Sequence, residues 1–179
     1  MVVLQWADAS YCKDRWDWFS VQLDDDTEMV CCVYDDGKVK TYFADISYSD
    51  NRQEHYKEIE IIPLEKHRIS PKSKAVYPLL WKIKIPAKNI NLNLTAKIEN
   101  QEMLFGSINY WEGPLQVDGD FGGEKVRGVG FMELVGYPSQ YGNVKYINDE
   151  ISKMASRFAS MAKNKAFNIT RDFKKKIIG

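Results

Sequence analysis

The stretch from Asn109 to Tyr137 constrains the fold of this chain more than any other segment. It contains two apolar runs, separated by a polar segment that carries Gly119, Gly122 and Gly123. In a soluble protein, so much Trp, Tyr, Phe, Leu and Val is accepted only at buried positions. We therefore predict two buried strands that face each other across a glycine-rich turn.

Each of the two runs carries one glutamate, Glu112 in the first and Glu133 in the second. A buried carboxylate must be paired or hydrogen-bonded, or it stays protonated. The two glutamates are therefore interpreted either as internal braces of the fold or as the polar end of a ligand pocket.

Short strand-like segments recur through the first 137 residues, with polar turns between them. Residues 16–23 alternate between an apolar face and a mixed face, and residues 35–37, Asp-Asp-Gly, are a strong hairpin signal. Regular spacing of this kind predicts an all-β fold, a single antiparallel barrel or sandwich. We favour an antiparallel β-barrel, because the strands of residues 109–137 are apolar on both faces, as in a barrel wall that is also covered on its outside.

The pattern changes after Tyr137 and becomes helical from Asn148. Ile151, Met154, Phe158 and Met161 recur at intervals of three and four, which predicts a C-terminal α-helical tail. We therefore divide the chain into a barrel, residues 1–141, and a tail, residues 142–179. The tail is interpreted either as a surface helix that closes the barrel or as a docking helix for a partner or a membrane surface.

The composition excludes several classes of function. Among 179 residues, 25 basic side chains balance 25 acidic ones, so no nucleic-acid partner is expected. The three cysteines, two of them adjacent, make a poor disulfide framework, and reduced thiols favour a cytoplasmic protein. His55 and His67 lack metal-ligand spacing, so neither a metal nor a cofactor is expected. No apolar run is long enough to span a membrane.

The stretch from Asn109 to Tyr137 also carries a family resemblance. Tyr110–Gly113 (Tyr-Trp-Glu-Gly) and Gly130–Tyr137 (Gly-Phe-Met-Glu-Leu-Val-Gly-Tyr) resemble the AttH-like, carotenoid 1,2-hydratase-like lipocalin superfamily. Trp16–Asp25, Tyr77–Trp81 and Gln101-Glu102 agree in the same order. The resemblance covers about residues 5 to 137.

The resemblance implies that a first barrel is missing. Members usually contain two lipocalin-like barrels, and the motifs present here look like those of the second. The missing barrel would have been removed, would come from a partner chain, or would be replaced by a second copy in a homodimer. Members include carotenoid hydratases and fungal Diels–Alder cyclases.

The resemblance also implies candidate catalytic residues. In the hydratases a His-x-Trp motif opens the second barrel, and here it reads Leu4-Gln5-Trp6, so leucine replaces the histidine. A Tyr-x-Asp motif follows, matched by Tyr34 and Asp36. Acid-catalysed hydration needs a positioned acid, and leucine cannot supply a proton.

Two groups of candidate functional side chains are expected, one of carboxyl groups and one of tryptophans. Glu112, Glu133 and Asp36 are expected to form a carboxyl cluster, in which one raised pKa would give a general acid near neutral pH, unless the glutamates are structural. The tryptophans are expected to line a ligand cavity, unless they are core packing. The ligand-binding set is Trp6, Trp16, Trp18, Trp81, Tyr110, Trp111 and Glu133, and the catalytic set is Tyr34, Asp36 and Glu112.

The sequence leaves three functions open. The first is a barrel that binds a hydrophobic small molecule, isoprenoid- or polyketide-like. The second is a hydratase or cyclase acting on such a molecule, where a cyclase would tolerate the loss of histidine better because it needs mainly shape. The third is a structural role, in which this barrel completes the barrel of another chain.

Overall fold

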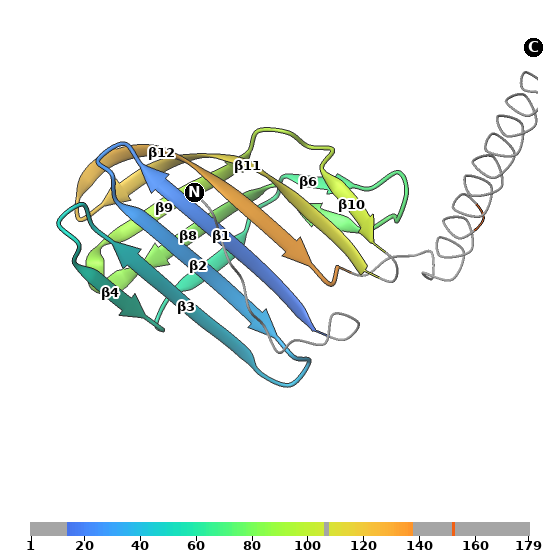
Figure 1. Cartoon of the computed structure of the whole chain (residues 1–179), viewed down its shortest axis with the longest axis horizontal. Coiled ribbons are helices and arrows are strands. Elements are labelled where there is room, and N and C mark those ends of the chain that lie inside the picture. Colours follow the sequence, from blue (N-terminus) through green and yellow to red (C-terminus); the bar gives the residue numbers. More distant parts are fainter. Residues whose placement is uncertain (1–13, 106–107, 138–151, 153–179) are drawn as a thin grey trace, which may run out of the picture. The chain divides into compact units, whose positions relative to one another are not determined.

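A computed structural model describes residues 14–105, 108–137 and 152 (Figure 1). Within these ranges the chain is built mainly of β-strands. In chain order the elements are β1 (Arg15–Leu23), β2 (Glu28–Asp35), β3 (Lys40–Ser47), β4 (Gln53–Tyr56), β5 (Glu60–Pro63), β6 (His67–Ile69), β7 (Val76–Pro78), β8 (Leu80–Ile85), the 3-10 helix η1 (Pro86–Lys88), β9 (Ile90–Ala96), β10 (Glu102–Phe105), β11 (Ile108–Phe121) and β12 (Glu124–Val135).

One antiparallel sheet contains most of these strands, in the order β4-β3-β2-β1-β12-β11-β9-β8-β5. The long strand β11 has two partners on one side, because residues 108–111 pair with β10 and residues 115–121 pair with β9. β6 and β7 form a separate two-stranded sheet. The predicted all-β, antiparallel fold is therefore confirmed.

β11 and β12 are the two strands predicted from the signature stretch. They pair continuously, from Tyr110 opposite Val135 to Phe121 opposite Glu124. Gly122 and Gly123 form the turn with φ values of 63° and 97°, a conformation that glycine adopts without steric cost. The glycine-rich turn between two apolar strands is thus confirmed.

The sheet curls strongly along β1 and β12 (Figure 1). Gly128 and Gly130 face the inside of the curl, and a Cβ atom there would lie 2.2 Å from the carbonyl oxygen of Gln22 and 2.4 Å from that of Ser20. Their missing side chains let the two strands approach closely. Among the described residues no backbone pairing joins β4 to β5, so the predicted barrel is a curled half-barrel.

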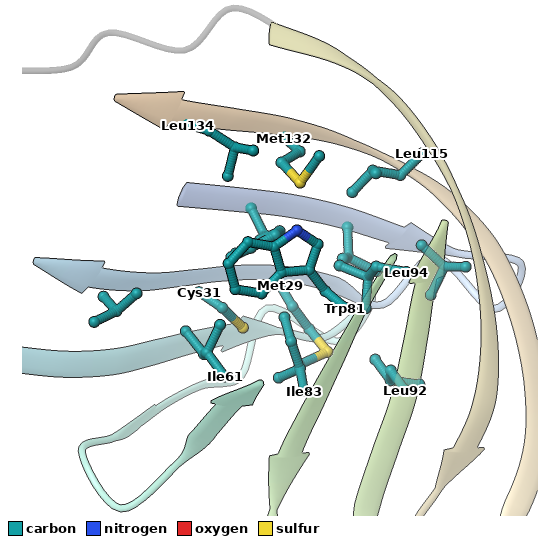
Figure 2. Close-up of a cluster of buried hydrophobic side chains, with 14 of the residues drawn as sticks. Met29, Cys31, Ile61, Trp81, Ile83, Leu92, Leu94, Leu115, Met132 and Leu134 are labelled. Carbon is teal, nitrogen blue, oxygen red and sulfur yellow. The ribbon is translucent and has the colours of Figure 1, made fainter. Parts of the chain in front are cut away.

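The inner face of the half-barrel is filled by its own side chains (Figure 2). Trp81 packs edge-on against Phe19 with 5.1 Å between ring centroids, and residues from β2, β8, β9, β11 and β12 surround them. The residues fully buried in this core include Met29, Ile83, Ile85, Leu92, Leu94, Leu115, Met132 and Leu134. This inner core leaves little space for a ligand among the described residues.

Side chains join β4, at one end of the sheet, to the segment between β8 and β9, near its other end. Glu54 on β4 accepts hydrogen bonds from Tyr48 and Tyr56 and forms a 2.8 Å ion pair with Lys88 in η1. Tyr48 also meets the ring of Phe121 edge-on. The edge strand β4 is therefore tied to the segment that follows β8 by polar and aromatic contacts.

The predicted helical tail lies outside the described residues, since only Ser152 of residues 142–179 is described. The domain boundary after residue 141 therefore stays a prediction. In the described part of the chain, no helix has the length and apolarity needed to cross a membrane.

Candidate functional site

Strand alternation places a carboxyl group on the inner face of β1. Because Phe19, Val21 and Leu23 point into the core, Asp17 lies on the same face, two residues before Phe19. Only 5% of its surface is exposed. A buried carboxyl group among apolar neighbours has to be hydrogen-bonded or ion-paired, or it stays protonated.

Asp17 is bound by a tyrosine and an arginine. The hydroxyl of Tyr137 donates to Oδ1 of Asp17 at 2.7 Å, and Nη2 of Arg15 lies 3.6 Å from Oδ2. The guanidinium of Arg15 also stacks over the ring of Tyr137, 4.0 Å from its centroid. Gly136, with φ of 79°, makes the turn after β12 that brings Tyr137 to this place.

Burial determines the protonation of this group. Burial raises the pKa of Asp17, although the charge of Arg15 and the hydrogen bond from Tyr137 oppose the shift. Burial and the neighbouring carboxylate also raise the pKa of Tyr137 well above its ordinary value, so its hydroxyl stays a donor. A carboxyl of this kind can hold or release a proton closer to neutral pH than an exposed aspartate.

Asp17 and Arg15 line a cavity of about 110 Å³, which we call the Asp17 cavity. Trp81, Val33, Ile61 and Pro63 supply its apolar walls. Its remaining lining residues are polar, namely Asp35, Lys40 and Tyr42. The cavity thus combines an apolar wall with a few convergent polar groups, which is typical of small-molecule sites.

A network of hydrogen bonds around Asn109 holds Tyr137 in place. The side-chain amide of Asn109 donates to the backbone oxygen of Tyr137 at 3.0 Å and to the hydroxyl of Tyr77 at 2.9 Å. The Tyr77 hydroxyl in turn donates to Glu102, which also accepts hydrogen bonds from Ser70 and Ser73. These contacts fix the position of Tyr137, and therefore the geometry at Asp17.

Glu112 and Glu133, both predicted to be functional, lie opposite each other on β11 and β12. They point to the outer face of the sheet, away from Asp17. Nε1 of Trp16 donates to Glu133 at 2.5 Å, and Tyr110 packs edge-on against Trp16 at 6.3 Å. Burial raises the pKa of Glu133, the indole hydrogen bond opposes the shift, and the charge of Glu112 adds to it.

Asp36 does not join this carboxyl pair. It lies exposed in the turn between β2 and β3, where the backbone N–H groups of Val39 and Lys38 lower its pKa. This placement corrects the predicted three-carboxyl cluster, because a hairpin turn keeps Asp36 in solvent. Tyr34, also predicted to be catalytic, lies on the outer face and donates to Asp14 at 2.5 Å.

The predicted tryptophan-lined cavity is not formed by the described residues. Period-2 alternation places Trp16 and Trp18 on the outer face of β1, where they pack with Cys32 and Val135. Trp81 and Trp111 lie in the inner core, and of these only Trp81 lines the Asp17 cavity. Trp6 lies outside the described residues.

The prediction from sequence missed Arg15, Asp17 and Tyr137 as site residues. A signal for Asp17 was present, because an acidic residue shares the inward face of Phe19, Val21 and Leu23. Nothing in the sequence paired it with Tyr137, 120 residues away. That contact depends on the register between β1 and β12, which sequence alone does not give.

The described residues contain no group of three or more His, Cys, Asp or Glu side chains that could hold a metal ion. Cys31 and Cys32 are free and buried, and burial raises the pKa of both thiols to about 12. These two thiols are therefore protonated at neutral pH and are poor nucleophiles.

The curled antiparallel sheet defines a lipocalin-like half-barrel, and the Asp17 cavity lies on its inner face. The sequence matches the AttH-like family over residues 5–137, and the chain therefore belongs to that family. No curated protein matches the sequence at a significant level. The resemblance stated from the sequence is thus confirmed.

Solved structures support the same fold. Kievitone hydratase from Nectria haematococca superposes with a TM-score of 0.62 at 22% identity, covering 71% of this chain and 40% of that protein. A protein from Nitrosomonas europaea assigned as AttH gives a TM-score of 0.58 at 24% identity, covering 69% of this chain and 38% of that one. The chain therefore spans well under half the length of either protein.

Proposed function

We propose that this chain is a ligand-binding part of an AttH-like protein, and that the Asp17 cavity takes the oxygenated end of a hydrophobic small molecule, isoprenoid- or polyketide-like. One observation carries the proposal. A carboxyl group that is only 5% exposed lines a cavity whose other walls include Trp81 and Ile61. A ligand hydroxyl or carbonyl would meet Asp17 or Arg15 there, while its carbon chain would meet the apolar wall.

The size of the cavity limits what it can hold. About 110 Å³ is below the 300–1,000 Å³ of a typical ligand pocket. The inner core is filled, so the rest of the ligand has to extend beyond the cavity. A first-barrel partner chain or a second copy of this chain would then cover it. Both similar structures extend well beyond the part that this chain matches, which is consistent with such a cover.

A second candidate function is catalysis of hydration. The raised pKa of Asp17 favours it, because a protonated carboxyl beside an apolar wall can give its proton to an alkene carbon. Water would then add to the resulting carbocation and return a proton to the carboxylate, so the acid is restored. Asp17 fits this role better than Asp36, whose pKa is lowered in an exposed turn. Kievitone hydratase is named for hydration, and its structural likeness to this chain is consistent with this candidate function.

Calorimetric titration with farnesol and farnesene tests the binding function. The two share an isoprenoid chain, but only farnesol has a hydroxyl group. We expect farnesol to bind at least tenfold more tightly, and the difference to disappear in Asp17→Ala. Asp36→Asn, in the exposed turn, is the matched control and should bind like the wild type. Equal affinity for both ligands, or an unchanged preference in Asp17→Ala, would refute the proposal.

Hydration is tested separately in water enriched in oxygen-18. Mass spectrometry of farnesene after incubation would show a labelled alcohol with the wild type and none with Asp17→Asn. Retained binding without labelled product would leave binding as the function and exclude hydration of this substrate.

A further inference from the structure

A second hollow lies on the outer face of the sheet, on the opposite side from Asp17. It has a volume of about 770 Å³, within the range of ligand pockets. We call it the polar groove. Its floor comes from β8, β9, β11 and β12, and the turn between β1 and β2 adds a rim. The lining residues are Asp24, Asp25, Lys82, Asn91, Asn93, Asp118, Gly119, Asp120, Lys125, Val126 and Arg127.

The strand register arranges the floor of the groove in two rows. In the first row Lys82, Asn93, Asp118 and Arg127 stand opposite one another on the four strands. In the second row Asn91, Asp120 and Lys125 repeat the order of amide, carboxylate and cation. Lys84 stands next to Asn91 in the register but lies outside the groove lining, where it pairs with Glu60. Each row therefore places hydrogen-bond donors beside acceptors on neighbouring β-strands.

Contacts within the rows orient these groups. The amide of Asn93 donates to Asp118 at 3.3 Å, and Lys125 forms a 2.8 Å ion pair with Asp120. Four aspartates and three cationic residues line the groove, so its charges nearly cancel. A balanced surface of this kind disfavours a polyanion and suits a neutral ligand with many hydroxyl groups, since each hydroxyl both donates and accepts.

Apolar side chains continue the same face along β12. Val129 and Phe131 are 50% and 39% exposed, and both point outward in register after Arg127. Phe131 lies four residues from Arg127, roughly 14 Å along a strand. A few sugar rings span such a distance, and the apolar face of a sugar ring packs on an aromatic side chain.

We propose that the polar groove and Phe131 form a binding site for a neutral oligosaccharide of about four rings. The hydroxyl groups of the sugar bind the two polar rows, and its last ring packs on Phe131. This site is independent of the function proposed for the Asp17 cavity, because the two lie on opposite faces of the sheet.

Calorimetry with maltotetraose, cellotetraose and chitotetraose tests the site, with a heparin tetrasaccharide as the anionic comparison. We expect saturable binding of at least one neutral sugar, weakened at least tenfold in Asn93→Ala/Asp118→Ala and severalfold in Phe131→Ala. Val39→Ala, exposed in the β2–β3 turn, should not change it. Thermal melting shows whether each variant is folded, and Asn91→Ala serves if the double variant is not.

Three results would overturn the proposal. They are the absence of binding for all three neutral sugars at millimolar concentration, binding that the groove variants leave unchanged, and binding of heparin alone. Asp17→Ala should retain the sugar binding, which separates a failure of this site from a failure of the Asp17 cavity.

Discussion

The hydroxyl group of Tyr137 donates a 2.7 Å hydrogen bond to Oδ1 of Asp17, and this contact joins residues 120 positions apart in the sequence. It places a buried phenol beside a buried carboxyl at the end of the inner core. The pKa of Asp17 is raised because burial outweighs the help of Tyr137 and Arg15. The ionised form of Asp17 is therefore less favourable in the folded state than in the unfolded state.

This relationship predicts a pH-dependent effect of Asp17→Asn on stability. A carboxyl with a raised folded pKa binds its proton more tightly in the native state, so stability falls as pH rises from about 4 through the raised pKa. Asparagine keeps an acceptor for Tyr137 and does not ionise. We expect the melting temperature of Asp17→Asn, relative to the wild type, to increase between pH 4 and pH 7. Parallel melting curves across this range would contradict the shift.

Two substitutions beside Glu133 should shift its pKa in opposite directions. Glu112→Gln removes a neighbouring negative charge, so the pKa of Glu133 should fall. Trp16→Phe removes the indole donor, so the pKa of Glu133 should rise. Carbon-detected NMR titration of the Glu133 carboxyl measures both. A shift in the same direction in the two variants would show that Glu112 and Trp16 do not act as the contacts indicate.

The contacts of Glu54 should stabilise the folded state at neutral pH and lose this effect in acid. Hydrogen bonds from Lys88 and Tyr56 lower the pKa of Glu54 to about 2. Its contribution is therefore complete above the ordinary value of about 4.5 and is lost as pH falls toward 2. We expect the melting temperature of the wild type to exceed that of Glu54→Gln at pH 6, and the difference to shrink by pH 2. Glu60→Gln, in the exposed Glu60–Lys84 pair, is a control that should show a much smaller change.

A side chain at Gly128 should clash with the backbone of β1 and disturb the curl of the sheet. A Cβ atom at this position would lie 2.2 Å from the carbonyl oxygen of Gln22 and 2.9 Å from Cα of Leu23, both of them backbone atoms that cannot rotate away. We expect Gly128→Ala to lower the free energy of unfolding by about 1–3 kcal/mol, the usual cost of overpacking. Urea denaturation measures the loss, and Val129→Ala on the exposed face should have less effect.

The fold was largely predictable, because period-2 alternation and turn glycines are local properties of the sequence. They placed β11, β12 and the Gly122–Gly123 turn correctly. The curl was not predictable from alternation, since it depends on Gly128 and Gly130 meeting the backbone of β1. The same limit explains why a half-barrel replaced the expected closed barrel.

The candidate site was predicted less well than the fold. Pairing Glu112 with Glu133 required only that two strands meet across a turn, and the structure brings them together. Placing Trp16 and Trp81 in one cavity required knowing which face of each strand is inward, and they lie on opposite faces. Asp17 and Tyr137 meet through the register between β1 and β12, the first and last strands in chain order, which no local pattern encodes.

The contact between Glu54 and Lys88 has a mechanical consequence. The end strands β4 and β5 share no backbone ladder in the described chain, so only side chains close the gap between them. These are the Glu54–Lys88 ion pair, the tyrosine contacts of Glu54 and the packed inner core. Widening this gap would break exchangeable side-chain contacts and leave every hydrogen-bonded strand pair intact. A change in the width of the half-barrel is therefore resisted by side-chain contacts and by the packing of the inner core, and not by backbone hydrogen bonds between the two end strands.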